Sequence, residues 1–375
     1  MKTIIKWPGG KSKELNYVRQ LIPKDFDRYI EPFFGGGAVY FDIEPKKAII
    51  NDRCKELILF YKYVKDDLDR ESFKVELYRY VDCWEKISNY MEAVFEELLE
   101  LYLDYRQGLA NSSQMKERVL AVFTENTVAI DNHFNINFTI LPGNLLRQMS
   151  KNTIAKLSRI MILEEKQGCL STEDLMKNIE TAIRSGFYMH FRDLLNTYSV
   201  EGRIIPEVKK VANYYFIREF CYGSMFRFSS KGEFNIPYGG IGYNRKNFRK
   251  KVDLIFSEKT SKILSNTIIE TMDFEDFFQK YILTDDDFVF LDPPYDSDFS
   301  KYEQNSFTLE DQIRLSKCLV NLNAKFILII KKTDFIMDLY RDKPGVNITS
   351  FEKTYLYNVR GRNNRKTEHL LICNY

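Results

Sequence analysis

A short apolar run at 288–291 ends at Asp292-Pro293-Pro294-Tyr295, and this ending constrains the fold more than any other stretch of the chain. The run predicts a buried strand of a parallel sheet. Neither proline has the N–H that a sheet ladder needs, so we expect the strand to end at Leu291. An acid and an aromatic ring are therefore presented at the carboxyl end of a strand, where open α/β sheets bind their ligands.

Short strands alternate with helices at both ends of the chain, which predicts a doubly wound α/β sheet. The expected strands lie at 29–30, 48–50, 288–291, 326–330 and 369–373, with another in the region from 267. From about 66 to 220, apolar residues such as Met91, Val94 and Leu98 recur at helical spacing. We therefore predict one domain at 1–65 and 263–375, interrupted by a discontinuous helix-rich domain at 66–262.

The composition excludes several classes of protein. A net charge of +2 gives no global field typical of nucleic-acid binding, so any basic footprint must be local. The six cysteines show no CxxC pairing and the three histidines lie far apart, which disfavours a metal site or a disulfide framework. No signal peptide opens the chain and no apolar run approaches the length of a membrane span. We expect a cytoplasmic protein with no metal and no membrane association.

Three further motifs accompany the Asp292 turn. Glycines in 31–37 allow positive φ angles and the close approach of a ligand, although an ordinary tight turn uses them too. Asp52 follows a predicted strand, where a carboxylate can bind ribose hydroxyls or cap a helix. The segment 6–11 joins an aromatic residue, two glycines and two lysines, which suits either a loop that folds over a ligand or a disordered N-terminus.

The Asp292 turn has a specific chemical interpretation. An exocyclic amine on an aromatic ring is a weak nucleophile, because its lone pair is delocalised into the ring. The Asp292 carboxylate and the Pro293 carbonyl can accept hydrogen bonds from both N–H groups, which frees the lone pair for attack on a methyl sulfonium. Tyr295 can stack on the ring. The alternative, a plain turn after a strand, loses weight because the other motifs accompany this one in order.

Together these motifs resemble one family, the D12-class, Dam-like DNA adenine-N6 methyltransferases of the alpha group. The matching blocks lie at 6–11, 31–37, 51–52, 232–239, 292–295 and 306–308, with the terminal stretch to Tyr375. The resemblance implies a Rossmann-like sheet with a target-recognition domain. It also implies S-adenosylmethionine as methyl donor and S-adenosylhomocysteine as product. The implied acceptor is N6 of a flipped adenine in double-stranded DNA at a specific short site, as in the modification enzyme of a restriction–modification system.

The resemblance also implies roles for individual residues. Asp292, Pro293, Pro294 and Tyr295 form the catalytic turn that holds the target adenine. The expected cofactor-binding residues are Trp7, Lys11, Phe33, Gly35, Gly37, Asp52, Asp273, Phe274 and Asp292. The two glycines would let the methionine end of the cofactor pass close to the backbone.

A basic, aromatic segment at about 222–252 is the predicted recognition hairpin. A charge cluster is usually a solvated surface, but the resemblance favours phosphate contacts and base stacking here. Arg227 is expected to contact a guanine edge and Tyr222 to wedge into the base stack. The expected DNA-binding residues are Tyr222, Arg227, Lys231, Pro237, Arg245 and Lys246.

The chain departs from the family at two places. Gly223-Ser224-Met225 replaces the more usual Asn-Gly-Leu-like run, which puts a GATC target in doubt. The helical middle is longer than in compact members, which suits either scaffolding or added DNA contacts. Two loops are also candidates for function: 297–306 for closing over the flipped base, and 360–366 for phosphate contact or a solvated hairpin tip.

Alternative functions would use the same turn. A planar amine or amide also occurs in RNA adenine and in protein glutamine, but the basic segment with Arg227 favours duplex DNA. A catalytically silent fold that only binds DNA or a partner is disfavoured by the intact Lys11, Asp52 and Asp292.

Overall fold

The computed structural model describes residues 1–125, 141–225, 227–295, 307–354 and 366–375, which form two compact units. Unit 1 comprises Met1–Arg70 and Leu254–Tyr375, and unit 2 comprises Glu71–Asp253. The domain boundaries predicted from the sequence, 65/66 and 262/263, differ from these by five residues at the first boundary and by nine at the second. The assignment of catalysis to one unit and recognition to the other stays a prediction.

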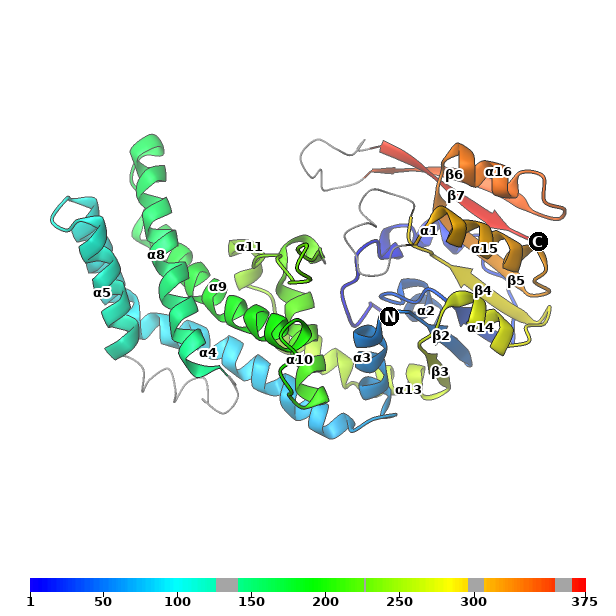
Figure 1. Ribbon diagram of the computed structural model, residues 1–375, viewed down its shortest axis with the longest axis horizontal. Helices are drawn as coiled ribbons and strands as arrows, with labels where there is room; N and C mark the ends of the chain where they lie inside the picture. Colours follow the sequence, from blue (N-terminus) through cyan, green and yellow to red (C-terminus); the bar gives the residue numbers. More distant parts are fainter. Residues whose placement is uncertain (126–140, 226, 296–306, 355–365) are drawn as a thin grey trace. The chain divides into compact units, whose positions relative to one another are not determined.

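Unit 1 contains a seven-stranded mixed sheet (Figure 1). The strands, in spatial order, are β3 (Thr267–Glu270), β2 (Ala48–Asn51), β1 (Arg28–Glu31), β4 (Asp287–Leu291), β5 (Lys325–Lys331), β7 (Lys366–Cys373) and β6 (Asn347–Thr354). β1 to β5 pair in parallel, whereas β7 runs antiparallel to both β5 and β6. This is the α/β sheet of mostly parallel strands that the sequence predicted, with the strand order reversing between β1 and β4.

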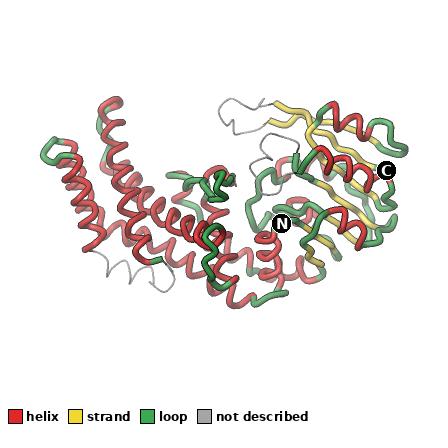
Figure 2. Tube along the Cα trace, viewed as in Figure 1, coloured by secondary structure: helices red, strands yellow, loops and turns green. Residues whose placement is uncertain are grey.

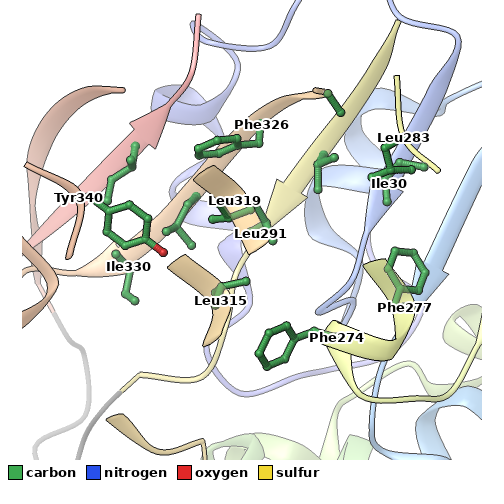
Figure 3. Close-up of a cluster of buried hydrophobic side chains, with 14 of the residues drawn as sticks. Ile30, Phe274, Phe277, Leu283, Leu291, Leu315, Leu319, Phe326, Ile330 and Tyr340 are labelled. Carbon is green, nitrogen blue, oxygen red and sulfur yellow. The ribbon is translucent and has the colours of Figure 1, made fainter. Parts of the chain in front are cut away.

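Three helices cover one face of the sheet: α14 (Phe274–Lys280), α15 (Leu309–Val320) and α16 (Asp334–Tyr340). Between them and the sheet lies one hydrophobic cluster, to which the strands contribute Ile30 and Leu291 and α14 contributes Phe274 (Figure 3). A capping box starts α15, because the Thr308 hydroxyl accepts from the Asp311 N–H and the Asp311 carboxylate accepts from the Thr308 N–H.

Aromatic side chains fill the opposite face of the sheet. Tyr29 precedes Ile30 in β1 and therefore points the other way, where its ring lies 6.1 Å from that of Tyr40. Phe34 joins Tyr40 to Tyr61, at ring-centroid distances of 5.3 and 4.8 Å. The helices of unit 1 besides α14 to α16 are η1 (Lys11–Lys13), α1 (Leu15–Val18), α2 (Ala38–Ile43), α3 (Lys55–Lys65) and α13 (Glu258–Ser265).

The chain leaves and re-enters unit 1 at neighbouring points. The Arg70 guanidinium donates to the Phe256 carbonyl at 3.3 Å and to the Ser261 hydroxyl at 2.9 Å. Arg70 is the last residue before unit 2, and Phe256 lies just after the return at Leu254. One side chain therefore ties the outgoing and returning segments together.

Unit 2 is helical (Figure 2). The helices that the structure describes in this unit are α4 (Arg70–Arg106, starting at the boundary), α5 (Ser112–Glu125), α8 (Pro142–Gln167), α9 (Thr172–Ser199), α10 (Glu207–Phe220), η2 (Tyr222–Ser224), α11 (Ile241–Asn244) and α12 (Phe248–Ile255, ending beyond the boundary). Trp84 of α4 lies 4.1 Å from Phe220 and 6.0 Å from Phe187 between ring centroids, at the centre of an aromatic core. α8 and α9 meet closely at Gly186, where an added Cβ would stand 2.5 Å from the Met149 Cα.

The predicted hairpin at 222–252 is wrong in its second half. Among the described residues of the first half, isolated bridges join the two sides, Cys221 with Tyr238 and Phe228 with Phe234. From residue 241 the chain is helical in α11 and α12, because Phe248, Val252 and Ile255 are buried at helical spacing. We call residues 221–238 the recognition loop, after the DNA recognition that the sequence predicts for this segment.

Two predicted loops fall outside the described residues: 297–306, and 360–366 apart from the backbone of its last residue, where β7 begins. Within the described ranges, no helix combines the length and the apolar character needed to cross a membrane. Nor does this part of the chain hold a group of three or more His, Cys, Asp or Glu side chains arranged to bind a metal ion.

Candidate active site

Three carboxylates stand at one edge of the sheet. Glu31, Asp52 and Asp292 lie at or just beyond the carboxyl ends of β1, β2 and β4, which are parallel neighbours. The sheet order reverses between β1 and β4, and such a switch point is where α/β sheets bind ligands. Burial raises the pKa of Glu31 well above its usual range, and the charges of Asp292 and Asp52 raise it further. Three carboxyl groups that disfavour one another's ionisation therefore share this edge.

Lys11 provides the compensating cation. Its Nζ donates to Oδ2 of Asp292 at 2.5 Å and to the Gly9 carbonyl at 2.8 Å. The Lys11 side chain is 3% exposed and that of Asp292 is 20% exposed. Burial raises the pKa of Asp292 above its ordinary value, while Lys11 acts to lower it. Among the described residues Lys11 is the one donor to this carboxylate, so Oδ1 can accept from a bound group.

The proline turn is fixed from two sides. Pro293 is buried, and the Pro294 carbonyl accepts from Nε2 of Gln312 in α15 at 3.2 Å. The half-buried Tyr295 ring lies 5.2 Å from Lys11 Nζ. On another side, the His369 ring stands edge-on to it, with centroids 5.2 Å apart and an interplanar angle of 79°. The fold thus holds an acid and an aromatic ring together, as the sequence predicted.

Asp52 joins the glycine loop to the end of β2. It accepts from the Gly35 N–H at 2.8 Å and from the Cys54 N–H at 2.9 Å. Burial raises the pKa of Asp52, and these two backbone donors oppose the rise. A Cβ on Gly35 would stand 2.7 Å from Cδ1 of Trp7, so the indole lies directly on the glycine loop. The structure therefore brings Trp7, Gly35 and Asp52 together.

Gly37 provides the left-handed backbone conformation at the end of the glycine loop, directly before α2. Its φ of 63° lies in the left-handed region, and an added Cβ would stand 2.5 Å from the Phe34 ring. A side chain at this position would both strain the backbone and displace a buried ring. The glycine requirement predicted from the sequence therefore has a steric cause at both positive-φ glycines of the loop.

The other predicted cofactor residues take part in the fold. The rings of Phe33 and Phe274 lie 5.5 Å apart, and Phe274 is only 1% exposed. Asp273 caps α14 by accepting from the Glu275 N–H at 3.0 Å, and it accepts from Arg314 at 2.6 Å. A cofactor contact from this segment therefore depends more on Asp273 than on the buried Phe274 ring.

Three residues near the site were missed as site residues by the sequence analysis. Asn51 donates to the Pro32 and Met272 carbonyls and accepts from the Met272 N–H, which joins the loops after β1 and β3. Glu31 accepts from the Tyr29 hydroxyl at 2.7 Å. His369 lies on β7, and a lone histidine in an apolar strand gives no sequence signal for a site.

The predicted DNA-binding residues lie in unit 2, most of them on the recognition loop and exposed. The exposed set is Tyr222 at 45%, with Arg227, Lys231, Pro237 and Arg245. Lys246 differs, because its Nζ donates to the Glu219 carbonyl at 2.9 Å and lies 3.0 Å from the Tyr243 ring centroid. Its charge is directed toward the end of α10, where it stabilises the fold.

Helix α9 supports the recognition loop through side chains. Asn196 accepts from the Phe234 N–H at 2.8 Å and donates to the Phe234 carbonyl at 3.1 Å. Tyr188 donates to the Ile236 carbonyl at 3.0 Å. Within the loop, Arg227 Nε donates to Oδ1 of Asn235 at 3.1 Å. The arginine is thus oriented by a loop that is itself attached to a long helix.

Comparison with known proteins shows which family the chain resembles over nearly its whole length. The model of the D12 class N6 adenine-specific DNA methyltransferases matches residues 7–141 and 144–357. Type II methyltransferase M.MjaIII of Methanocaldococcus jannaschii is 27% identical over 395 residues, spanning 100% of this chain and 99% of that protein. M.CviBI of Paramecium bursaria Chlorella virus NC1A is 25% identical over 380 residues, and M1.LlaDCHI of Lactococcus lactis subsp. cremoris is 24% identical over 387 residues. These two alignments span 100% of this chain, with 100% of M.CviBI and 96% of M1.LlaDCHI.

Proposed function

The chain belongs to the D12 class of N6 adenine-specific DNA methyltransferases, and from this premise we propose that the Asp292 turn holds the amine of a target adenine flipped out of duplex DNA. One observation carries the proposal: a carboxylate anchored by Lys11 through Oδ2, next to a half-buried Tyr295 ring, at the switch point of the sheet. The family does not favour RNA adenine, protein glutamine or a silent fold as alternatives. Several relatives are named type II methyltransferases, so the role we propose is modification in a restriction–modification system.

S-adenosylmethionine is the proposed methyl donor, and the residues at the β1 and β2 ends fit it. Gly35 and Gly37 leave no side chain on a loop that follows β1, so a ligand can approach the backbone. Asp52 keeps a carboxylate at the β2 end with lone pairs beyond those used by its two backbone donors, which suits ribose hydroxyls. The cofactor supplies a methyl group on a sulfonium, which is the electrophile of the reaction.

In this proposal Asp292 and Pro293 do the positioning. Oδ1 of Asp292 and the Pro293 carbonyl accept from the two N–H groups of adenine N6, and the lone pair of N6 is then directed at the methyl group. After transfer, N6 carries one proton too many. The Asp292 carboxylate is suited to receive it, because burial raises the pKa of this group.

DNA recognition is proposed for the recognition loop. The target adenine must leave the base stack to reach a residue at a sheet edge. Tyr222 would fill the gap, Arg227 would contact a base edge, and Lys231 and Arg245 would contact phosphates. Pro237 would lie near a base edge. These roles are supported by the exposure of all five side chains and by the orientation of Arg227 toward Asn235.

The test is Asp292→Asn. Asparagine keeps an oxygen for Lys11 and the shape of the turn, but it loses the charge that receives the proton. Asp292→Ala is less informative, since it removes the oxygen that accepts from the buried Lys11 as well as the charge, and it can cost about 3–5 kcal/mol of stability. We expect Asp292→Asn to lower methyl incorporation into DNA by about 100-fold or more.

The measurement uses DNA from cells that lack adenine methylation, with labelled S-adenosylmethionine and with sequencing that identifies modified adenines. Asp27→Asn is the matched control, because that carboxylate is 56% exposed and pairs with Lys47 at the surface. The control should methylate at the wild-type rate. Wild-type activity in Asp292→Asn would overturn the assignment of this turn.

A further inference from the structure

We infer that His369 is a positioning residue that fixes the Tyr295 ring for stacking on the target base. The inference rests on the proposed function of Tyr295 and adds to the site a residue from the antiparallel end of the sheet. His369 lies on β7, between Lys331 of β5 and Phe351 of β6 in the strand register.

The contact between His369 and Tyr295 is direct. Nδ1 of His369 lies 3.5 Å from the Tyr295 hydroxyl, and the imidazole stands at 79° to the phenol ring. The His369 side chain is fully buried, with the Phe351 ring 5.7 Å away between centroids. The imidazole is therefore held by the sheet and presents one nitrogen to the tyrosine.

The two prolines fix the backbone before Tyr295 but not its side chain. Because this side chain is only half-buried, contacts with neighbouring side chains must fix the position of its ring. Lys11 Nζ approaches the ring at 5.2 Å from its centroid, which holds one side by a cation–π contact. His369 determines where the hydroxyl end lies. Hydrogen bonds at catalytic sites are often long before substrate binds and shorten in the complex, so a distance of 3.5 Å is suited to this role.

The protonation state of His369 favours the same role. Burial lowers its pKa to about 3, helped by the positive charges of Lys353, Lys11 and Lys331. Lys353 is paired with Glu14 at 2.8 Å, and Lys11 with Asp292. A neutral imidazole can hydrogen-bond a hydroxyl without adding a charge beside the Lys11–Asp292 pair.

The experiment combines substitutions at both residues. His369→Leu removes the ring nitrogens, whereas His369→Asn keeps a polar atom near the position of Nδ1. Tyr295→Phe keeps the stacking ring and removes the hydroxyl. The single-turnover rate of methyl transfer to DNA, the KM for DNA and the affinity for S-adenosylmethionine are measured for each variant and for His369→Leu combined with Tyr295→Phe.

We expect His369→Leu and Tyr295→Phe each to lower the single-turnover rate about 10-fold, with unchanged affinity for S-adenosylmethionine, since a small displacement of a positioning group costs rate. The double variant should be no slower than either single variant, because both remove the same contact. His369→Asn should recover most of the rate. His190→Leu, which removes a fully buried histidine of unit 2, should lower thermal stability without lowering this rate.

Several results would overturn the inference. The effects of His369→Leu and Tyr295→Phe could multiply in the double variant, or Tyr295→Phe could methylate at the wild-type rate. The second result decides the matter even if His369→Leu fails to fold, because Tyr295→Phe leaves the buried histidine in place. A wild-type enzyme that methylates DNA adenine while these tests fail leaves the proposed function standing. Absence of methylation by the wild type overturns both.

Discussion

Among single residues, those at the site are buried in a way that makes their charge states depend on one another. Lys11 is almost fully buried and pairs with Asp292, whose pKa is raised by burial and lowered by Lys11. Removing one partner of such a pair leaves the other buried without compensation. His369 is buried near the same charges, and its imidazole remains neutral because burial and the nearby lysines lower its pKa to about 3.

The neutral state of His369 predicts a pH dependence of stability. Between pH 7 and pH 5 the unfolded chain protonates this imidazole, whose ordinary pKa is 6.5, while the folded chain does not, because its pKa is about 3. The folded state binds fewer protons, so its stability falls as pH falls. From this residue alone the loss is about 2 kcal/mol.

Urea unfolding at the two pH values measures this loss. The difference in unfolding free energy between pH 7 and pH 5 should be smaller in His369→Asn than in the wild type. Equal differences in the two proteins would show that the folded imidazole titrates normally.

At the scale of elements, helices and strands owe their positions to close contacts as much as to apolar patterns. β4 and the turn after it could be predicted, because a buried apolar run meets two prolines. β6 could not, since six of its eight residues are polar and Phe351 is its one buried residue, as is usual for an edge strand. The helical second half of 222–252 was missed because its basic residues outweighed the spacing of Phe248 and Val252.

Contacts between residues that are far apart in the sequence are the part of the site that could not be predicted. Asp292 and Asp52 follow strands, and strand ends are visible in a sequence. The bond from Lys11 to Asp292 joins residues 281 positions apart, and its existence follows only from the paired strands. The contact of His369 with Tyr295 depends in addition on β7 running antiparallel, which no local pattern indicates.

Because α8 and α9 approach closely at Gly186, we can predict how the methyl group added by Gly186→Ala changes stability. Gly186→Ala should gain about 1 kcal/mol in helix propensity. The new Cβ would stand 2.5 Å from backbone of Met149, so the helices must separate. Overpacking typically costs about 1–3 kcal/mol, and contact with backbone puts this case at the upper end.

We therefore expect a net loss of stability of about 1–2 kcal/mol for Gly186→Ala. Thermal unfolding measures it. Gly143→Ala is the control, because an added Cβ there meets nothing within 4 Å. A Gly186→Ala variant as stable as the wild type would show that the two helices separate at little cost.

The attachment of the recognition loop to α9 makes Asn196 a test of loop order. Asn196→Ala removes both side-chain hydrogen bonds to the Phe234 backbone. The loop must then be ordered when DNA binds, so affinity should fall by about 10-fold at fixed salt. The dependence of affinity on salt should not change, because no phosphate contact is lost.

Binding titrations at several salt concentrations separate these effects. Lys231→Ala is the comparison, since loss of the phosphate contact that we propose for Lys231 should lower the salt slope by about one. If Asn196→Ala also lowers the dependence of DNA affinity on salt, the substitution does not act through the order of the loop.

At the scale of the whole molecule, the chain consists of one unit made from two segments and one unit that is continuous. Unit 2 is the continuous segment Glu71–Asp253 and has an aromatic core around Trp84. Compact units with their own core can fold alone. We expect residues 71–253, expressed separately, to be helical and to unfold cooperatively on heating.

Circular dichroism of that fragment provides the measurement. A fragment with half of α9 deleted should lose both helicity and cooperativity, since α9 packs against α8, α10 and α11. If the complete 71–253 fragment shows no thermal transition, unit 2 needs unit 1 to fold.

The tie made by Arg70 has a consequence for how specificity can change. This one side chain holds the outgoing and returning segments of unit 1 side by side. If unit 2 carries the target recognition that we propose for it, a relative's counterpart can be grafted by joining two adjacent chain ends, with the residues of unit 1 left unchanged. In that case new target sequences can arise by exchange of one continuous segment as well as by gradual change of single contacts.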